Sequence, residues 1–220
     1  MNAYLLGYDI RLTADAYVAQ RWTGQHRETF LLRPETRWPV SVDSSVWPTV
    51  FRYTDQKSGF LGVPLAEEVQ AAQPDFAHRV LDLWQDPEAM RHALKQSDAA
   101  PSLAGKTVEM AVTLSADASV ADIRRWSGLF EDADAFRTRQ PPAHWQFLGF
   151  DVADDAMTSG LSNCGFTEAE KPETQARFGG HLNYFGLFQR WTDADQFRMA
   201  CNTRIPEHSP FYVFGIHRAL

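Results

Sequence analysis

The segment SGLSNCGF, residues 159–166, contains the side chain best suited to nucleophilic chemistry, the thiol of Cys164. Thr167 and Glu170 form a capping box just beyond it, so Cys164 lies shortly before a predicted helix N-terminus, where partial positive charge favours a thiolate. With His181 as the base, this arrangement would suit a Cys/His-dependent hydrolase or transferase. The competing interpretation is a buried, inert cysteine in a structured turn, and we adopt it.

His208 is the other histidine with a chemical neighbour, because it directly follows Glu207. A carboxylate beside an imidazole can tune a general base, which makes His208 the alternative partner of Cys164. A histidine held between Pro206 and Pro210 more often fixes a loop by hydrogen bonding to the backbone. We therefore expect a structural role for His208 and no catalytic residue in this chain.

Acidic residues cluster on both sides of the cysteine-bearing segment. Asp151, Asp154 and Asp155 end a predicted strand, and Glu168 and Glu170 begin a predicted helix. Clustered carboxylates suit a hard cation, but the Gly-bearing loop with regular ligand spacing that such a site requires does not occur. The two common phosphate-binding motifs, GxGxxG and GxxxxGKS, are also missing from the sequence. We expect no metal and no cofactor, and assign the carboxylates to helix starts or to contacts with a basic partner.

The overall charge excludes some partner classes. The chain has 28 acidic and 21 basic residues and a net charge of −7, so direct binding of nucleic acid would require a basic patch that the sequence lacks. No apolar run is long enough to span a bilayer, and the start MNAYLLGYDI lacks the basic flank of a signal peptide. We therefore predict a cytoplasmic protein without a membrane partner, whose two cysteines are thiols.

The second half of the chain shows the clearer periodicity. Residues 107–114 (TVEMAVTL) alternate between apolar and other side chains, which is typical of a strand with one buried face. The predicted elements that follow are a helix capped by Ser119, strands at 144–152 and 183–191, a helix from Thr192 and a strand at 211–216. This order is that of a split βαβ (ferredoxin-like) unit, an α+β fold with an antiparallel or mixed sheet and helices on one face. An insertion at 153–182 lies between its two central strands.

The first half is less regular. Residues 4–10 (YLLGYDI) predict a buried strand, and a short helix is expected over 14–21. Another helix is expected over 75–85, continued from Pro87 to about residue 95. The stretch 97–105 indicates a link, so we divide the chain into halves at 1–100 and 101–220 that pack tightly together.

Three tryptophans, Trp22, Trp38 and Trp47, accompany the proline-rich residues 34–48. Exposed tryptophan is enriched at protein interfaces, and an interface anchored here is one hypothesis. We expect core packing for at least two of the three.

The two halves also share a short pattern. LLGYDI at 5–10 is similar to FLGFDV at 147–152, and a polar, Ala-rich stretch follows each. Two interpretations stand. The similarity is either chance among buried strands or the trace of a duplicated unit, in which the first half is a degenerate copy of the second.

The blocks LGFDVADDAMTSGLSNCGF, LNYFGLF and RIPEHSPFYVFGIHRAL carry a family resemblance over about residues 145–220. This part of the chain resembles an uncharacterised bacterial family that is associated with immunity proteins of secreted polymorphic toxins. The resemblance supplies no catalytic residues, and its motifs are strand ends and turns. It implies a protein that binds and neutralises a cognate toxin.

We therefore predict a cytosolic immunity-type protein that occludes the active site of a toxin domain, a mechanism that needs no chemistry from this chain. The acidic composition suggests a basic, nuclease-like target. The residues expected at the contact are Asp151, Asp154, Asp155, Glu168, Glu170, Trp145 and Phe166. The alternatives are the Cys/His-dependent enzyme, using Cys164 with His181 or His208, and a small-ligand sensor domain, since split βαβ sheets often bind metabolites.

Overall fold

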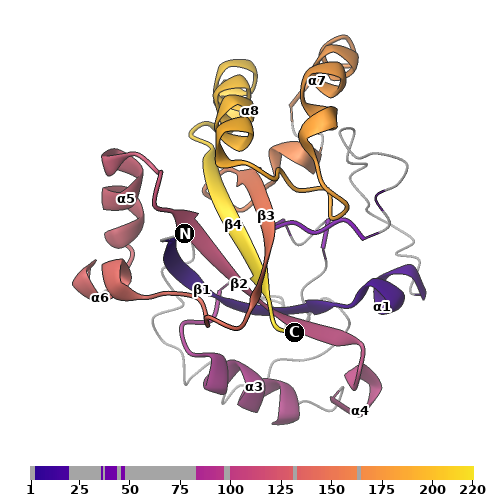
Figure 1. The fold of residues 1–220 in the computed structure, drawn as a ribbon, viewed down its shortest axis with the longest axis vertical. Coiled ribbons are helices and arrows are strands. Elements are labelled where there is room, and N and C mark those ends of the chain that lie inside the picture. Colours follow the sequence, from indigo (N-terminus) through magenta and orange to yellow (C-terminus); the bar gives the residue numbers. More distant parts are fainter. Residues whose placement is uncertain are drawn as a thin grey trace.

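A computed structural model describes residues 3–19, 36, 38–43, 46–47, 83–96, 100–130, 133–162 and 165–220 (Figure 1). The strands are β1 (Ala3–Leu12), β2 (Thr107–Ser115), β3 (Gln146–Ala153) and β4 (Tyr212–Arg218). The helices are α1 (Ala14–Ala19), α3 (Pro87–Gln96), α4 (Ala100–Leu103), α5 (Val120–Ser127), α6 (Ala133–Thr138), α7 (Glu170–Phe178) and α8 (Trp191–Arg204). Three short 3-10 turns are η2 (Gly160–Ser162), η3 (Gly179–His181) and η4 (Pro206–His208). Within these described residues, no helix is both long and apolar enough to cross a lipid bilayer.

The four described strands form one sheet in the order β1-β2-β4-β3, and each neighbouring pair is antiparallel. The predicted α+β class with an antiparallel sheet is confirmed. The two central strands, β2 and β4, are buried over most of their length on both faces, which accounts for the continuous apolar run FYVFGI. Strand β1 lies in the same sheet as the strands that follow residue 100.

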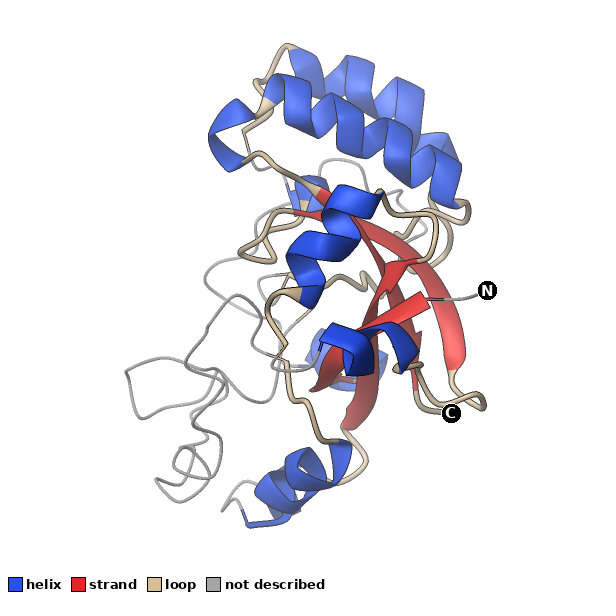
Figure 2. Ribbon diagram, turned by 90° about the vertical axis from the view of Figure 1, so that its left-hand side faces the viewer, coloured by secondary structure: helices blue, strands red, loops and turns tan. Residues whose placement is uncertain are grey.

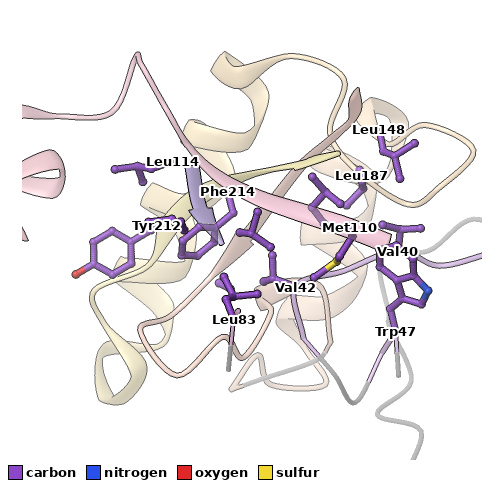
Figure 3. Packing of buried hydrophobic residues seen from close by; sticks show 14 of the residues in the cluster. Val40, Val42, Trp47, Leu83, Met110, Leu114, Leu148, Leu187, Tyr212 and Phe214 are labelled. Carbon is purple, nitrogen blue, oxygen red and sulfur yellow. The ribbon is translucent and has the colours of Figure 1, made fainter. Parts of the chain in front are cut away.

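Buried apolar side chains fill both faces of this sheet. On one face, Met110 and Phe214 lie in one cluster with Val40, Val42 and Trp47 (Figure 3). Side chains of α5 and α6, Trp126 and Phe136, belong to the same cluster. On the other face, α7 and α8 cover β3 and β4, while α3 and α4 cover β1 and β2. Figures 1 and 2 show these two helix pairs above and below the strands. Helices therefore cover both faces of the sheet, whereas we expected them on one face only. The reason is that the central strands carry apolar side chains on both faces.

The tryptophans of the proline-rich segment contribute to this core. Trp38 and Trp47 are buried and pack edge to face, with ring centroids 5.7 Å apart. The expectation that at least two of the three tryptophans lie in the core is confirmed, while Trp22 lies outside the described residues.

Several predicted elements are also confirmed. The helix after Ser119 is α5, and the Ser119 hydroxyl oxygen accepts a hydrogen bond from the Asp122 amide, as its capping position predicts. The continuation from Pro87 is α3, and the helix expected from Thr192 is α8. Of the helix expected over 75–85, the structure describes only residues 83–85. They are not helical, because Trp84 forms a β-bridge with Tyr8.

The strand predicted at 183–191 is wrong. The side-chain oxygen of Asn183 accepts hydrogen bonds from the amides of Phe185 and Leu187, and Gly186 adopts a positive φ of 75°. These features close a tight turn, so the segment makes only isolated bridges, such as that between Phe150 and Phe188. Within this turn Leu187 and Phe188 are buried, whereas Tyr184 is exposed. Without that strand, the predicted ferredoxin-like order of elements is not confirmed, although the neighbouring strands of the sheet are all antiparallel.

The similar segments LLGYDI and FLGFDV occupy equivalent places in the fold, at opposite edges of the sheet. Each contains a register shift just before its glycine, at Gly7 in β1 and at Gly149 in β3. Two residues later, Asp9 and Asp151 each accept a hydrogen bond of 2.8 Å from the next backbone amide. The likeness in sequence therefore corresponds to a likeness in backbone structure.

The remaining elements follow the same repeat. An isolated bridge protects each edge strand, Tyr8 with Trp84 and Phe150 with Phe188, and a helix begins three residues after each bridge. The second strand of each unit lies at the centre of the sheet, where Val112 of β2 pairs with Ile216 of β4. An approximate twofold axis thus relates β1–α3–β2 to β3–α8–β4. This relation favours duplication over chance, with β2 belonging to the first unit.

Candidate functional site

Asp151 is the centre of a buried polar network on the face of the sheet that residues 38–47 cover. Its side chain is fully buried, and one carboxylate oxygen accepts hydrogen bonds from the Ser41 hydroxyl at 2.6 Å and the Val42 amide at 2.9 Å. The other oxygen accepts from the Ser159 hydroxyl at 2.7 Å and the Val152 amide at 2.8 Å. Burial raises the pKa of the Asp151 carboxyl, and these four hydrogen bonds act in the opposite direction.

A second buried carboxylate, that of Asp43, extends the network into the inserted segment. It accepts a hydrogen bond from the Ser159 amide at 3.1 Å, and the Ser162 hydroxyl lies at the same distance. Ser159 therefore joins both acidic residues, through its hydroxyl to Asp151 and through its amide to Asp43. Ser159 and Ser162 of SGLSNCGF thus hold this segment by hydrogen bonds. Gly160 leaves space for the Cys201 thiol.

The other end of the segment 38–47 is held by strand β1. Arg11 is buried, forms an ion pair with Asp9 at 2.6 Å and donates hydrogen bonds to the carbonyl oxygens of Val42 and Trp47. The Trp47 indole N–H donates to the Leu12 carbonyl oxygen at 2.8 Å. Polar side chains from both edge strands thus fix this segment across the sheet.

His208 is held by the buried carboxylate of Asp154, from which its Nδ1 lies 3.0 Å away. The other Asp154 oxygen accepts hydrogen bonds from the amides of Ala156 and Thr158. The imidazole side chain is 39% exposed, whereas that of Asp154 is 4% exposed. This arrangement ties η4 to the end of β3, and it also has the geometry in which a carboxylate orients a general base.

His181 has a comparable partner at the first turn of α8. Its Nδ1 lies 3.2 Å from the Asp193 carboxylate, which also forms a bidentate pair with Arg190. The hydrogen bonds from Arg190 lower the pKa of Asp193. His181 and His208 thus pair with two different aspartates, Asp193 and Asp154.

A hollow of about 300 Å³ opens between α7 and α8. Phe166 and Phe178, both buried, line its interior, while Glu173 and Arg177 of α7 and Met199 of α8 are exposed around it. Figure 1 shows these two helices together at one end of the molecule. The hollow belongs to the inserted segment and the helix that follows it. Its lining is mixed, because aromatic rings lie inside it while Glu173, Arg177 and Arg204 bring charges of both signs.

An ion pair between Glu170 and Arg204, 2.6 Å apart, joins α7 to α8 beside this hollow. Glu170 also accepts hydrogen bonds from the amide and hydroxyl of Thr167, although α7 begins at Glu170 and its N-cap is Ala169, not Thr167 as the capping box predicts. The amide hydrogen bond is the largest cause that lowers the pKa of Glu170 to about 2, followed by the Arg204 contact.

The depressed pKa of Glu170 predicts an acid-sensitive link between the two helices. A carboxylate whose native pKa lies below its unfolded value stabilises the fold above the unfolded pKa and loses that contribution as the pH falls towards about 2. Carbon-detected NMR titration of the Glu170 carboxyl should give a midpoint near 2. In Arg204→Gln the midpoint should rise, while a midpoint that does not move would show that Arg204 has no influence on Glu170.

The structure separates the predicted contact residues into two groups. Asp151, Asp154 and Trp145 are buried away from the surface, and Phe166 is buried but lines the hollow between α7 and α8. The reason is that the carboxylates satisfy interior amides and hydroxyls and the aromatic rings fill the core. Asp155, Glu168 and Glu170 remain at least partly exposed and form ion pairs with Arg125, Lys171 and Arg204, respectively. Cys164, the candidate nucleophile, lies outside the described residues.

Sequence reasoning missed Asp43, Ser41 and the Asp9–Arg11 pair. These residues lie in the first half, more than a hundred positions from Ser159 and Asp151, and local periodicity carries no information on such contacts. One signal was present, since Asp9 occupies the same place in LLGYDI as Asp151 does in FLGFDV.

Groups of three or more His, Cys, Asp or Glu side chains with metal-binding geometry do not occur in the described part of the chain. Comparisons with protein-family models, curated protein sequences and solved structures found no match.

Proposed function

We propose that this chain is an immunity-type protein that binds a cognate bacterial toxin domain and covers its active site. The observation that carries the proposal is the hollow between α7 and α8, a recess lined by two buried phenylalanines and by charged and polar side chains, in the segment that the repeated scaffold does not need. Protein interfaces are commonly anchored by one large side chain that enters such a recess.

The residues behind the family resemblance support a binding role. Asp151, Asp154, Ser159 and His208 all belong to the blocks that carry the resemblance, and each makes a hydrogen bond or ion pair that fixes the shape of the inserted segment. A rigid surface binds with a smaller loss of conformational entropy than a mobile one. These four side chains, which are of types that could take part in catalysis, would thus serve to fix the conformation of the inserted segment.

The contact surface that we propose consists of the exposed side chains of α7 and α8 around the hollow, with Asp155 and Glu168 nearby in sequence. Glu168 is 89% exposed at its side chain, and Met199 is 58% exposed. Methionine adapts its shape to a partner, and exposed carboxylates attract a basic one. A basic toxin, such as a nuclease, would be complementary to the net charge of −7.

The proposal is tested by expressing the product of the neighbouring gene with and without this chain. Co-expression should abolish toxicity, and the two proteins should co-purify. A neighbouring product that is neither toxic nor bound would contradict the proposal.

Two substitutions at the hollow should then weaken the complex. We expect Met199→Asp and Glu173→Arg each to raise the Kd about 10- to 100-fold, because both place the wrong charge or polarity at the interface. Isothermal titration calorimetry would measure the change. Glu88→Arg on α3, at the opposite end of the molecule, is the matched control and should leave the Kd within about twofold. If all three variants changed the Kd by the same factor, the hollow would not be the interface.

A specific observation also favours a second function, a Cys/His-dependent enzyme. Asp154 holds His208 through Nδ1, the orientation found for a general base in hydrolases. A thiol-reactive probe at neutral pH should then label Cys164 in preference to the buried Cys201, and His208→Ala should slow that labelling. Unchanged biological activity of Cys164→Ser would dispose of this alternative.

A further inference from the structure

Two long segments interrupt the repeated scaffold at corresponding places. Each runs from the end of an edge strand to the isolated bridge that protects it, over residues 13–83 in the first unit and 154–187 in the second. The repeat itself needs neither segment, because β1–α3–β2 and β3–α8–β4 already complete the sheet. These two segments are therefore the parts of the chain that the repeat does not explain.

The two segments meet inside the protein. Asp43 of the first accepts hydrogen bonds from Ser159 and Ser162 of the second, and the Val40 amide donates to the Phe185 carbonyl oxygen at 2.9 Å. Ser159 and Ser162 are both fully buried, and Asp43 is 6% exposed. Few water molecules can replace these hydrogen bonds at such a depth, so the contact fixes the position of η2 relative to residues 38–43.

Along the chain, η2 comes before α7 and α8, the helices of the proposed contact surface. Phe166, a few residues beyond η2, stacks on Phe197 of α8 with a centroid distance of 6.1 Å and lines the hollow. Gly160 is packed against Cys201 and Phe197 of the same helix, with no room for a Cβ atom. A shift of η2 would therefore move the wall of the hollow.

We propose that Asp43 is a positioning residue, through which the first-half segment 38–43 sets the geometry of the inserted segment 154–182 and of the hollow beside it. The role in partner binding rests on the proposed function, whereas the coupling between the two segments does not. Asp43 would act at a distance, without touching the partner.

Hydrogen exchange of the protein alone tests the coupling. In Asp43→Ala, the Ser159 amide loses its acceptor, and we expect the amides of Ser159, Leu161 and Ser162 to exchange about 10- to 100-fold faster relative to those of the central strands. Asp43→Asn retains one acceptor oxygen and should give a smaller increase, which keeps the test valid if Asp43→Ala folds poorly. Met90→Ala in α3 is the control, because it removes a buried side chain from the other end of the core.

The control separates local opening from global destabilisation. Met90→Ala should not raise the exchange of the η2 amides relative to that of the central-strand amides, because global destabilisation speeds chiefly the central-strand amides. If neither Asp43→Ala nor Asp43→Asn raises that ratio, the proposal is overturned, whatever the partner proves to be.

The binding arm distinguishes this inference from the proposed function. With a toxin partner in hand, Asp43→Ala should raise the Kd at least tenfold while Met90→Ala does not, at a temperature where both variants are folded. Faster exchange with an unchanged Kd would overturn the positioning role. Faster exchange together with no toxin partner would uphold the coupling and count against the immunity function alone.

Discussion

Replacement of Asp151 by alanine should lower the free energy of unfolding by about 4 kcal/mol, because it removes the acceptor of four hydrogen bonds inside the core. Two hydroxyls and two backbone amides would remain buried without that acceptor, and each such group costs about 1–3 kcal/mol in its worst case. The loss also releases residues 41–42 from the sheet. Urea unfolding followed by tryptophan fluorescence would measure the change, since Trp38 and Trp47 lie in the same core.

The matched variant Asp151→Asn separates the charge from the hydrogen bonds. Its oxygen can still accept two of the four, so the expected loss is smaller. Burial raises the native pKa of Asp151, so the folded chain binds more protons than the unfolded chain between the two pKa values. The stability that this group contributes therefore falls as the pH rises through that window, and Asp151→Asn should remove the slope. A loss below about 1 kcal/mol in Asp151→Ala would mean that water satisfies the network.

Alanine at Gly149 should be as damaging as the loss of Asp151, with an expected cost of about 3–4 kcal/mol. Gly149 has a φ of 144°, which L-residues rarely adopt, and a Cβ atom there would lie 2.8 Å from both the Leu187 Cβ and the Phe188 carbonyl oxygen. The substitution would thus strain the backbone and separate β3 from the bridge that protects this edge. Thermal and urea unfolding should both report the loss.

The repeat predicts a parallel effect at the other edge. A Cβ atom on Gly7 would lie 2.7 Å from the Leu83 Cβ and 2.8 Å from the Trp84 carbonyl oxygen, so Gly7→Ala should cost about 2–3 kcal/mol through crowding alone. Gly105→Ala is the control. Gly105 has a positive φ of 70° with open space around it, and backbone strain there should cost only about 1 kcal/mol. Tolerance of alanine at Gly7 and Gly149 would argue that the two edges are not built alike.

Burial changes the functional interpretation of the acidic residues. As a sequence pattern, the carboxylates of Asp151, Asp154 and Asp155 form one cluster at a strand end. In the structure they face two different environments, because Asp151 and Asp154 point into the interior and Asp155 pairs with Arg125 at the surface. A partner would therefore contact the charged side chains on and around α7, and not the cluster of three aspartates.

Local sequence determined those elements whose signals lie within a few residues of one another. The alternation at 107–114, the serine cap at residue 119 and the proline at residue 87 each identify a strand or a helix start, and the structure has them. Alternation reports burial on one face, and caps report hydrogen bonds that close within one turn. Neither depends on the rest of the chain. The likeness of LLGYDI to FLGFDV likewise anticipated a repeat in the backbone.

Tertiary structure alone decided where the polar residues act. The run at 183–191 is as apolar as a strand, yet Asn183 and Gly186 close it into a turn, in which Leu187 and Phe188 are buried and Tyr184 is exposed. Asp43 and Ser159 are separated by more than a hundred residues and meet in the folded structure. Burial and long-range hydrogen bonding depend on how the elements pack against one another. Periodicity within one element therefore could not reveal them.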